Sequence, residues 1–221
     1  MRAAQRLFPL AKELAYRLHV KAGFFPQYPY MYSPAQLAFL CRCISELGDV
    51  EGSIVEVGSA YGSTTVFLNE HMRCTGISRR YVCVDTFSGF TTRDLEDEVS
   101  QRGRKPPSRA FRANKRKWVQ RTLDVNRANN VTLHEADAVT FDYTRIAPIA
   151  FCLIDVDLYL PVKAALDRVF DLVPAGGRIV VDDCARRNEA WDGAYDAYCE
   201  FVGERELEQR IMLDKLGVIH K

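Results

Sequence analysis

Short apolar runs alternate with amphipathic stretches through most of this chain. The apolar runs predict strands at 53–57, 81–84, 131–134, 150–154 and 178–181, and the stretches between them predict helices at 63–72, 115–125, 162–172 and 192–201. Two further runs, 207–213 and 217–220, predict a hairpin closed through Asp214-Lys215. Short apolar strands that alternate with helices are typical of a parallel sheet covered on both faces. We therefore expect an α/β fold with a doubly wound, mostly parallel seven-stranded sheet and a C-terminal antiparallel hairpin.

The N-terminal part of the chain lies outside this alternation. A leucine stripe at helical spacing runs through residues 3–21, a proline-containing aromatic segment covers 24–32, and Ser33-Pro34 is a typical start for a second helix. We therefore predict an N-terminal helical extension, 1–48, before a domain at 49–221. The stripe favours packing on the domain or on a second subunit, and we expect a homodimer. A helix lying on a membrane surface is the weaker alternative.

Composition narrows the class of protein. The chain has 221 residues, a formal net charge of +1 and 48% apolar residues, as in one globular domain of ordinary size. Such a charge gives no global bias toward nucleic acid or acidic membranes, and no apolar run approaches the ~20 residues of a membrane span. The seven cysteines are scattered and odd in number, which favours a reducing, cytoplasmic compartment. An acid-poor beginning also allows a transit peptide, but the regular leucine stripe disfavours it.

A glycine turn, Gly58-Ser59-Ala60-Tyr61-Gly62, joins the first strand of the sheet to a helix that begins at Ser63. Glycines there permit a tight turn and close approach of a ligand, although tight packing of helix on strand explains such a turn equally well. Glu56 stands where a dinucleotide-binding turn has its first glycine. Its carboxylate repels pyrophosphate and attracts an ammonium. Since S-adenosylmethionine carries an ammonium and a sulfonium but no phosphate, the turn favours that cofactor over NAD.

Acidic residues also stand at the carboxyl ends of the second and third predicted strands. Asp85 ends the second strand, where a carboxylate is placed to accept hydrogen bonds from ribose hydroxyls. Asp137 follows the third strand and is either a partner of the adenine amino group or a solvated strand-end acid. The cofactor-binding residues expected from these positions are Glu56, Gly58, Ser59, Ala60, Tyr61, Gly62, Ser63, Asp85, Thr86, Phe87, Asp137 and Ala138.

Four aspartates mark the ends of the fourth and fifth strands, namely Asp155, Asp157, Asp182 and Asp183. If these strands are neighbours, their carboxylates gather at one edge, which is costly unless a cation or a movable proton is involved. Hard oxygen ligands suit Mg²⁺ better than a soft metal. None of the four histidines is spaced as a metal or nucleophile partner, so acid–base work falls to carboxylates and metal, with Asp157 as a candidate proton acceptor. Helix capping and solvated strand ends are the structural alternative.

Several of these segments together resemble the macrocin O-methyltransferase family, which uses S-adenosylmethionine to methylate sugar hydroxyls in natural-product pathways. The resemblance is carried by Val55-Glu56-Val57-Gly58, Asp85-Thr86-Phe87-Ser88-Gly89-Phe90, Asp155-x-Asp157-Leu158-Tyr159 and Gly176-Gly177-x-Ile179-Val180-Val181-Asp182-Asp183. It extends from about Gly52 to Phe201 and implies a Rossmann-like methyltransferase fold.

The resemblance also implies roles for the acids. A Mg²⁺ site would be formed by Asp155, Asp182 and Asp183, the base would be Asp157, and Asp85 would hold the ribose of the cofactor. The chain departs from the family at Ser59-Ala60-Tyr61, where a bulkier, arginine-containing turn is common, and at Cys184, where an aromatic residue often follows the aspartate pair.

The segment 91–114 is too long for an ordinary connection and predicts a lid. Nine Lys or Arg and no acid lie between Arg102 and Arg121. These residues form either a solvated segment or a grip on an acidic group of a small-molecule acceptor; nucleic acid is a third and weaker interpretation.

We therefore expect a Mg²⁺-dependent O-methyltransferase that uses S-adenosylmethionine and acts on a small molecule, with neither nucleic acid nor membrane as partner. A metal-independent N- or carboxyl-methyltransferase and a non-catalytic S-adenosylmethionine-binding protein are the alternatives. An NAD-dependent oxidoreductase is disfavoured by Glu56.

Overall fold

The computed structural model describes residues 2–18, 27–105, 108–185 and 192–221. It contains two compact units, residues 1–31 and 32–221. The first unit holds α1 (Arg2–Arg17), on which Leu10 and Leu14 are 69% and 58% exposed. The second unit begins with α2 (Pro34–Ser45), which we had assigned to the N-terminal extension. Leu40 and Ile44 of α2 are buried and the helix packs on α3, so α2 is part of the larger unit.

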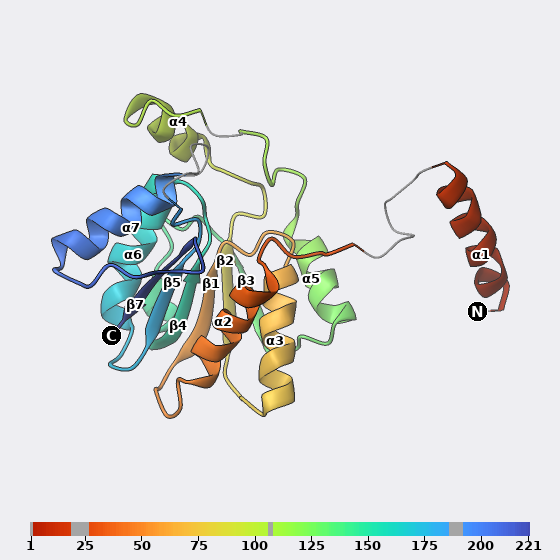
Figure 1. The fold of residues 1–221 in the computed structure, drawn as a ribbon, viewed down its shortest axis with the longest axis horizontal. Helices are drawn as coiled ribbons and strands as arrows, with labels where there is room; N and C mark the ends of the chain where they lie inside the picture. Colours follow the sequence, from red (N-terminus) through yellow and green to blue (C-terminus); the bar gives the residue numbers. More distant parts are fainter. Residues whose placement is uncertain (1, 19–26, 106–107, 186–191) are drawn as a thin grey trace. The chain divides into compact units, whose positions relative to one another are not determined.

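The larger unit is built on one seven-stranded sheet with the order β3-β2-β1-β4-β5-β7-β6 (Figure 1). Its strands are β1 (Ser53–Val57), β2 (Tyr81–Asp85), β3 (Val131–Glu135), β4 (Ile149–Ile154), β5 (Arg178–Val181), β6 (Ile211–Met212) and β7 (Leu216–His220). Strands β1 to β5 run parallel, whereas β7 is antiparallel to β5 and to β6. The expected doubly wound sheet with a closing antiparallel hairpin is confirmed.

Helices cover both faces of this sheet. They include α3 (Ser63–Thr75), α5 (Arg116–Val125), α6 (Tyr159–Val169) and α7 (Asp192–Glu204), with short 3-10 turns at Tyr143–Ile146 and Phe170–Leu172. Helix α4 (Thr92–Ser100) lies beyond the ends of the strands and contacts α6 (Figure 1). Helix α6 begins three residues earlier than the apolar pattern predicts, because Pro161 is tolerated in a first turn that lacks intrahelical N–H partners. Ser33 caps α2 in a capping box with Gln36, as its position before Pro34 predicts.

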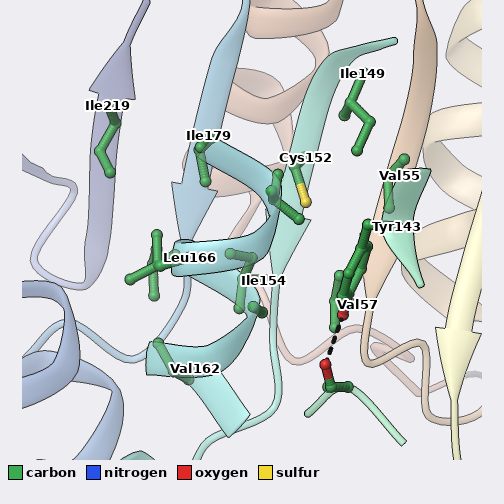
Figure 2. Packing of buried hydrophobic residues seen from close by; sticks show 14 of the residues in the cluster. Val55, Val57, Tyr143, Ile149, Cys152, Ile154, Val162, Leu166, Ile179 and Ile219 are labelled. Atoms are coloured by element: carbon green, nitrogen blue, oxygen red, sulfur yellow. Dashed lines mark hydrogen bonds between the residues drawn. The ribbon is translucent and has the colours of Figure 1, made fainter. Parts of the chain in front are cut away.

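The main core lies between the sheet and the helix pair α6 and α7 (Figure 2). Val57, Ile154 and Ile179 from neighbouring strands meet Val162 and Leu166 of α6 there, all fully buried. Burying such side chains contributes about 1.5–3 kcal/mol each. Strand β4 is buried along its whole length on both faces, which explains its unbroken apolar sequence. Strand β1 is equally buried but carries Ser53 and Glu56.

The insertion at 91–114 is not a plain loop. Thr91 caps α4 by accepting a hydrogen bond from the Asp94 backbone N–H at 3.1 Å. Thr-x-x-Asp before a helix is a sequence signal for such a start. Among the described residues, no helix is long and apolar enough to cross a membrane.

Candidate active site

The candidate site lies where the direction of the sheet connections reverses, between β1 and β4. Strand β1 pairs with β2 on one side and with β4 on the other. Ligands of doubly wound sheets bind beyond the carboxyl ends of the strands at such a point. Gly58 follows β1 with φ +88°, and the N–H of Asp155 donates to the carbonyl oxygen of Val57 at 2.7 Å. The glycine turn and the first aspartate of the acidic cluster are therefore adjacent.

The Asp85 carboxylate holds the glycine turn from the end of β2. Its Oδ2 accepts hydrogen bonds from the backbone N–H groups of Ser59 and Ala60 at 2.7 and 2.9 Å, and its Oδ1 accepts from that of Phe87 at 2.6 Å. Burial raises the pKa of Asp85, while these three N–H groups oppose that rise. N–H groups that a dinucleotide-binding turn would offer to phosphate are thus occupied by an internal carboxylate. The turn consequently disfavours a phosphate ligand. Because Oδ2 already accepts two hydrogen bonds and Oδ1 only one, Oδ1 is the Asp85 oxygen that retains capacity to accept from a ribose hydroxyl.

Glu56 does not face the ligand side of the turn as we expected. It is 1% exposed, and its Oε2 accepts hydrogen bonds from the hydroxyls of Thr65 and Tyr81 at 2.6 and 2.8 Å. Side chains alternate along a strand, so Glu56 points away from the core face occupied by Val55 and Val57. Burial raises its pKa to about 7. Glu56 therefore fixes β1 to β2 and α3, and the structure gives it no opening toward an ammonium group.

The other residues of the glycine turn differ in exposure and in hydrogen bonding. Tyr61 is 50% exposed, Gly62 has φ +81° at the start of α3, and Ser63 is the first helical residue. The buried hydroxyl of Ser59 has no hydrogen-bond partner within the described part of the chain. Asn114, which sequence reasoning missed, donates from Nδ2 to the carbonyl oxygen of Ala60 at 2.5 Å. The end of the insertion is thereby tied to the turn.

Asp137 has a different partner from the one expected. Arg93 of α4 contacts its Oδ2 at 2.9 Å, and the backbone N–H of Val139 donates to its Oδ1 at 2.9 Å. Ala138 beside it is buried. Asp137 is therefore neither a solvated strand end nor, in this conformation, open to an adenine amino group. Thr86 and Phe87 line the other side of β2's end, where the Thr86 hydroxyl donates to the carbonyl oxygen of Gly89 at 2.7 Å.

The structure brings the four aspartates of the acidic cluster, Asp155, Asp157, Asp182 and Asp183, together at the ends of adjacent strands, because Ile154 of β4 pairs with Val181 of β5. Asp157 and Asp183 have φ +60° and +55°. Left-handed backbone at residues other than glycine is a strain that collects at functional sites. Both residues thus hold a backbone conformation that is uncommon outside glycine, although aspartate tolerates it better than most residues.

Two residues that sequence reasoning missed complete the acidic cluster. The hydroxyl of Tyr32, a side chain 1% exposed, donates to Asp155 Oδ2 at 2.8 Å. Lys215, from the turn between β6 and β7, places Nζ 2.7 Å from Asp182 Oδ2 and 3.4 Å from Asp183 Oδ1. Sequence position gave no signal for either, because both come from outside the strands that carry the acids.

Burial and mutual repulsion shape the acid–base character of the acidic cluster. Burial, followed by the charges of Asp182 and Asp157, raises the pKa of Asp155 well above its ordinary range. The pKa of Asp157 is likewise raised, by burial and then by Asp183 and Asp182. Burial raises the pKa of Asp182 to about 6, and the Lys215 ammonium opposes that rise. Crowded carboxylates of this kind retain protons toward neutral pH unless a further cation joins them.

The acidic cluster can be tested for its fit to a metal ion. Asp182 Oδ1 is buried and has no hydrogen-bond partner among the described residues. The available donors are carboxylate oxygens, the ligand type that Mg²⁺ prefers. In the part of the chain that the structure describes, no three acidic, histidine or cysteine side chains are arranged as metal ligands, and Lys215 supplies the counter-charge. The residues fit a small divalent cation in chemistry, but that cation would compete with Lys215.

Helix α4 docks on the same end of the domain through buried charges. Glu98 Oε1 accepts a hydrogen bond from the backbone N–H of Tyr159 at 2.7 Å, at the start of α6. The Arg102 guanidinium donates hydrogen bonds to Glu98 Oε2 at 2.5 Å and to Asp192 Oδ1 of α7 at 3.1 Å. It also contacts Asp196. Arg104 pairs with Asp192 at 2.5 Å. Two of the nine basic residues of the insertion and the adjoining α5 are therefore used within the protein and do not face an acceptor.

A doubly wound sheet in the order β3-β2-β1-β4-β5-β7-β6, with a carboxylate-held glycine turn at its reversal point, defines a Rossmann-like S-adenosylmethionine-dependent methyltransferase. The family model of macrocin O-methyltransferase (TylF) matches residues 25–221. The chain belongs to this family of S-adenosylmethionine-dependent O-methyltransferases.

Solved structures support the fold. The O-methyltransferase NovP is 18% identical, with a TM-score of 0.72 over 88% of this chain and 83% of that one. The calicheamicin methyltransferase CalS11 is 19% identical, with a TM-score of 0.68 over 99% of this chain and 90% of that one. Its apo structure, described as a TDP-rhamnose 3'-O-methyltransferase, is 18% identical, with a TM-score of 0.61 over 99% and 92%. No curated protein matches the sequence.

Proposed function

We propose that this protein transfers a methyl group from S-adenosylmethionine to a sugar hydroxyl of a small molecule with the help of Mg²⁺. The observation that carries the proposal is the placement of four carboxylates at the ends of β4 and β5, directly beside the glycine turn. An oxygen nucleophile needs its proton removed where the methyl donor is held, and this arrangement supplies acids within reach of that turn.

The residues of the acidic cluster would divide the work. Asp157 is the proposed base. Its raised pKa makes its carboxylate a stronger base than an ordinary one, and the charge of the proposed cation would keep it deprotonated near neutral pH. Asp155, Asp182 and Asp183 are the proposed ligands of the cation, which would supply positive charge next to the acceptor oxygen. Tyr32 orients Asp155 through its hydrogen bond. The left-handed backbone at Asp157 sets the direction of the proposed base.

The cofactor would lie along the ends of β1, β2 and β3. Gly58 to Gly62 would form its floor, Asp85 would accept hydrogen bonds from the ribose, and the unpartnered hydroxyl of Ser59 is a further candidate contact. S-adenosylmethionine would supply the methyl group as a sulfonium. Contact of Asp137 with adenine requires that Arg93 first leave it.

The acceptor is proposed to carry an acidic group, in line with the TDP-sugar named for one structural relative. Arg102 and Arg104 are engaged with acids of α4 and α7. Arg109 and Arg112 are exposed in the same insertion and take part in no ion pair of the described residues. Guanidinium groups bind phosphate by paired hydrogen bonds. Changing Arg109 and Arg112 to Ala should therefore raise KM for a nucleotide sugar and leave a neutral acceptor unaffected.

The decisive experiment incubates the protein with methyl-labelled S-adenosylmethionine, Mg²⁺ and a panel of nucleotide sugars and glycosides, with products read by mass spectrometry. Asp157→Asn should lose about 10²–10⁴-fold in transfer rate while binding S-adenosylhomocysteine normally in calorimetry. Asp155→Ala should also lose transfer with cofactor affinity retained. Full turnover of either variant would exclude its proposed role, and wild-type turnover in chelator would favour the metal-independent alternative.

We further propose that α1 contacts a second copy of the chain, because its exposed leucines form an apolar stripe. Light scattering on a protein that begins at Tyr32 tests this without removing the partner of Asp155. The truncated protein should be monomeric where the whole chain is dimeric.

A further inference from the structure

Lys215 is held against the acidic cluster by its backbone as well as by its side chain. Its carbonyl oxygen accepts a hydrogen bond from the Cys184 backbone N–H at 2.7 Å, next to the aspartate pair. Its Nζ contacts Asp182 and Asp183, and it lies 4.6 Å from the centre of the Tyr32 ring. The side chain is only 20% exposed. The turn between β6 and β7 thus delivers one ammonium group to a defined place.

That ammonium is the only cation in ion-pair contact with the four aspartates among the described residues. Like charges crowded in a partly buried site repel strongly. Lys215 offsets part of this repulsion, and Tyr32 donates one hydrogen bond to Asp155. Asp182 Oδ1 nevertheless stays buried with no hydrogen-bond partner in the described parts of the chain. The internal groups therefore satisfy the acidic cluster only in part.

We propose that Lys215 is a built-in counterion that competes with a divalent cation for the acidic cluster. In the metal-free protein its ammonium holds the carboxylates together, and when a cation binds, Nζ leaves Asp182 Oδ2. Two cations cannot share one carboxylate edge without strong repulsion. The competition lowers metal affinity and lets the acidic cluster keep its arrangement without metal. This inference rests on the proposed metal role of Asp155, Asp182 and Asp183.

Lys163 provides a matched control. It is 16% exposed, pairs with Glu200 and Glu204 at 3.1 and 2.5 Å, and lies 6.0 Å from the centre of the Phe201 ring. Lys163→Met therefore removes an equivalent ammonium from two carboxylates and an aromatic ring, but on the paired surfaces of α6 and α7. Lys215→Arg keeps the charge at the acidic cluster and shows whether the charge itself matters.

The test measures binding of Mn²⁺ by electron paramagnetic resonance, as a probe for divalent cations, on the full-length proteins. Lys215→Met should bind Mn²⁺ about tenfold more tightly than the wild type or better, whereas Lys163→Met and Lys215→Arg should not. In chelator, Lys215→Met should melt about 5 °C lower than the wild type and recover when Mg²⁺ is added. S-adenosylhomocysteine binding serves as the check on folding.

The outcomes separate the two proposals. Equal Mn²⁺ affinity of Lys215→Met and wild type would overturn the competition and leave the metal site in place. Absence of Mn²⁺ binding by every variant would overturn the metal role and the competition with it. Weaker binding by Lys215→Met would also overturn the proposal, because Lys215 would then be needed to assemble the site. If Lys215→Met does not fold, Lys215→Gln replaces it in the same measurement. A Mn²⁺ affinity of Lys215→Gln equal to that of the wild type would then overturn the competition, and a tighter affinity would support it.

Discussion

A Cβ atom built on Gly58 would lie 1.9 Å from the backbone carbonyl oxygen of Asp155. No side-chain rearrangement relieves this approach, because both groups belong to the backbone at the ends of β1 and β4. The contact joins the proposed cofactor floor to the first residue of the acidic cluster. One glycine therefore determines how close the two halves of the site lie.

Gly58→Ala should destabilise the protein by about 3 kcal/mol or more, or prevent folding, since it adds a steric clash to an unfavourable φ. Gly76→Ala is the matched control, because Gly76 also has positive φ but has nothing within 4 Å of its position for a Cβ. That control should lose only about 1 kcal/mol. Urea unfolding of both variants measures the difference, and equal losses would show that the close approach is absent.

Glu56 should make stability depend on pH. Its pKa is raised to about 7 in the folded protein, above its ordinary value near 4.5, so the folded state holds the proton more tightly than the unfolded state. This group's contribution is most favourable below about pH 4.5 and is lost as pH rises toward 7, by about 3 kcal/mol in all. Glu56→Gln can still accept the Thr65 and Tyr81 hydrogen bonds. The difference in unfolding free energy between variant and wild type should grow in favour of the variant from pH 5 to pH 8; a constant difference would contradict the prediction.

Much of the fold could be predicted because its signals are local. The bounds of β1 and β5 coincide with their apolar runs, and Ser33 caps α2 as expected. The aspartates of the acidic cluster follow from strand order in the same way. The prediction that Glu56 faces the cofactor was wrong, although the alternation of side chains along β1 predicts its direction. Glu56 points to the opposite face of the sheet from Val55 and Val57.

Residues that reach the site from elsewhere could not be predicted in this way. Tyr32 precedes α2, and Lys215 follows β6, so each meets the acids only after the chain has folded. Arg93, in the first turn of α4, pairs with Asp137, which follows β3 and lies 44 residues away in the sequence. Such partners depend on tertiary contacts between segments that are distant in the sequence. Neither the spacing nor the composition of residues within one segment predicts them.

Tyr32→Phe should lower the transfer rate while leaving cofactor affinity unchanged. The substitution removes only the hydroxyl that donates to Asp155 Oδ2, leaving a buried ring in place. A stability loss of about 1–2 kcal/mol is expected from the missing hydrogen bond. Tyr198→Phe removes a buried hydroxyl that contacts Arg210 and Val218 and should destabilise without a change in kcat. If both variants lose kcat equally, the effect on Asp155 is not specific.

Arg102→Met should loosen α4 from α6 and α7. The substitution leaves the buried Glu98 carboxylate without its ion-pair partner and with only the Tyr159 N–H, while Asp192 keeps Arg104. Removing one partner of a fully buried ion pair costs about 3–5 kcal/mol. Limited proteolysis should then cleave within residues 101–114 faster than in the wild type. Arg73→Met, which breaks an exposed pair with Glu70, should change neither stability nor cleavage measurably. Unchanged protection in Arg102→Met would show that other contacts hold α4.

The hydrogen bond from the Tyr159 backbone N–H to Glu98 has a consequence for engineering the acceptor range. The Glu98 carboxylate of α4 accepts a hydrogen bond from a backbone N–H at the start of α6 and so caps this helix. Helix α6 follows directly on Asp157-Leu158. Exchange of the whole segment 91–114 for one from a homologue would uncap α6 and disturb the proposed base together with the acceptor contacts. A successful chimera must therefore retain Glu98 and its Arg102 partner and vary only the part of the segment beyond them.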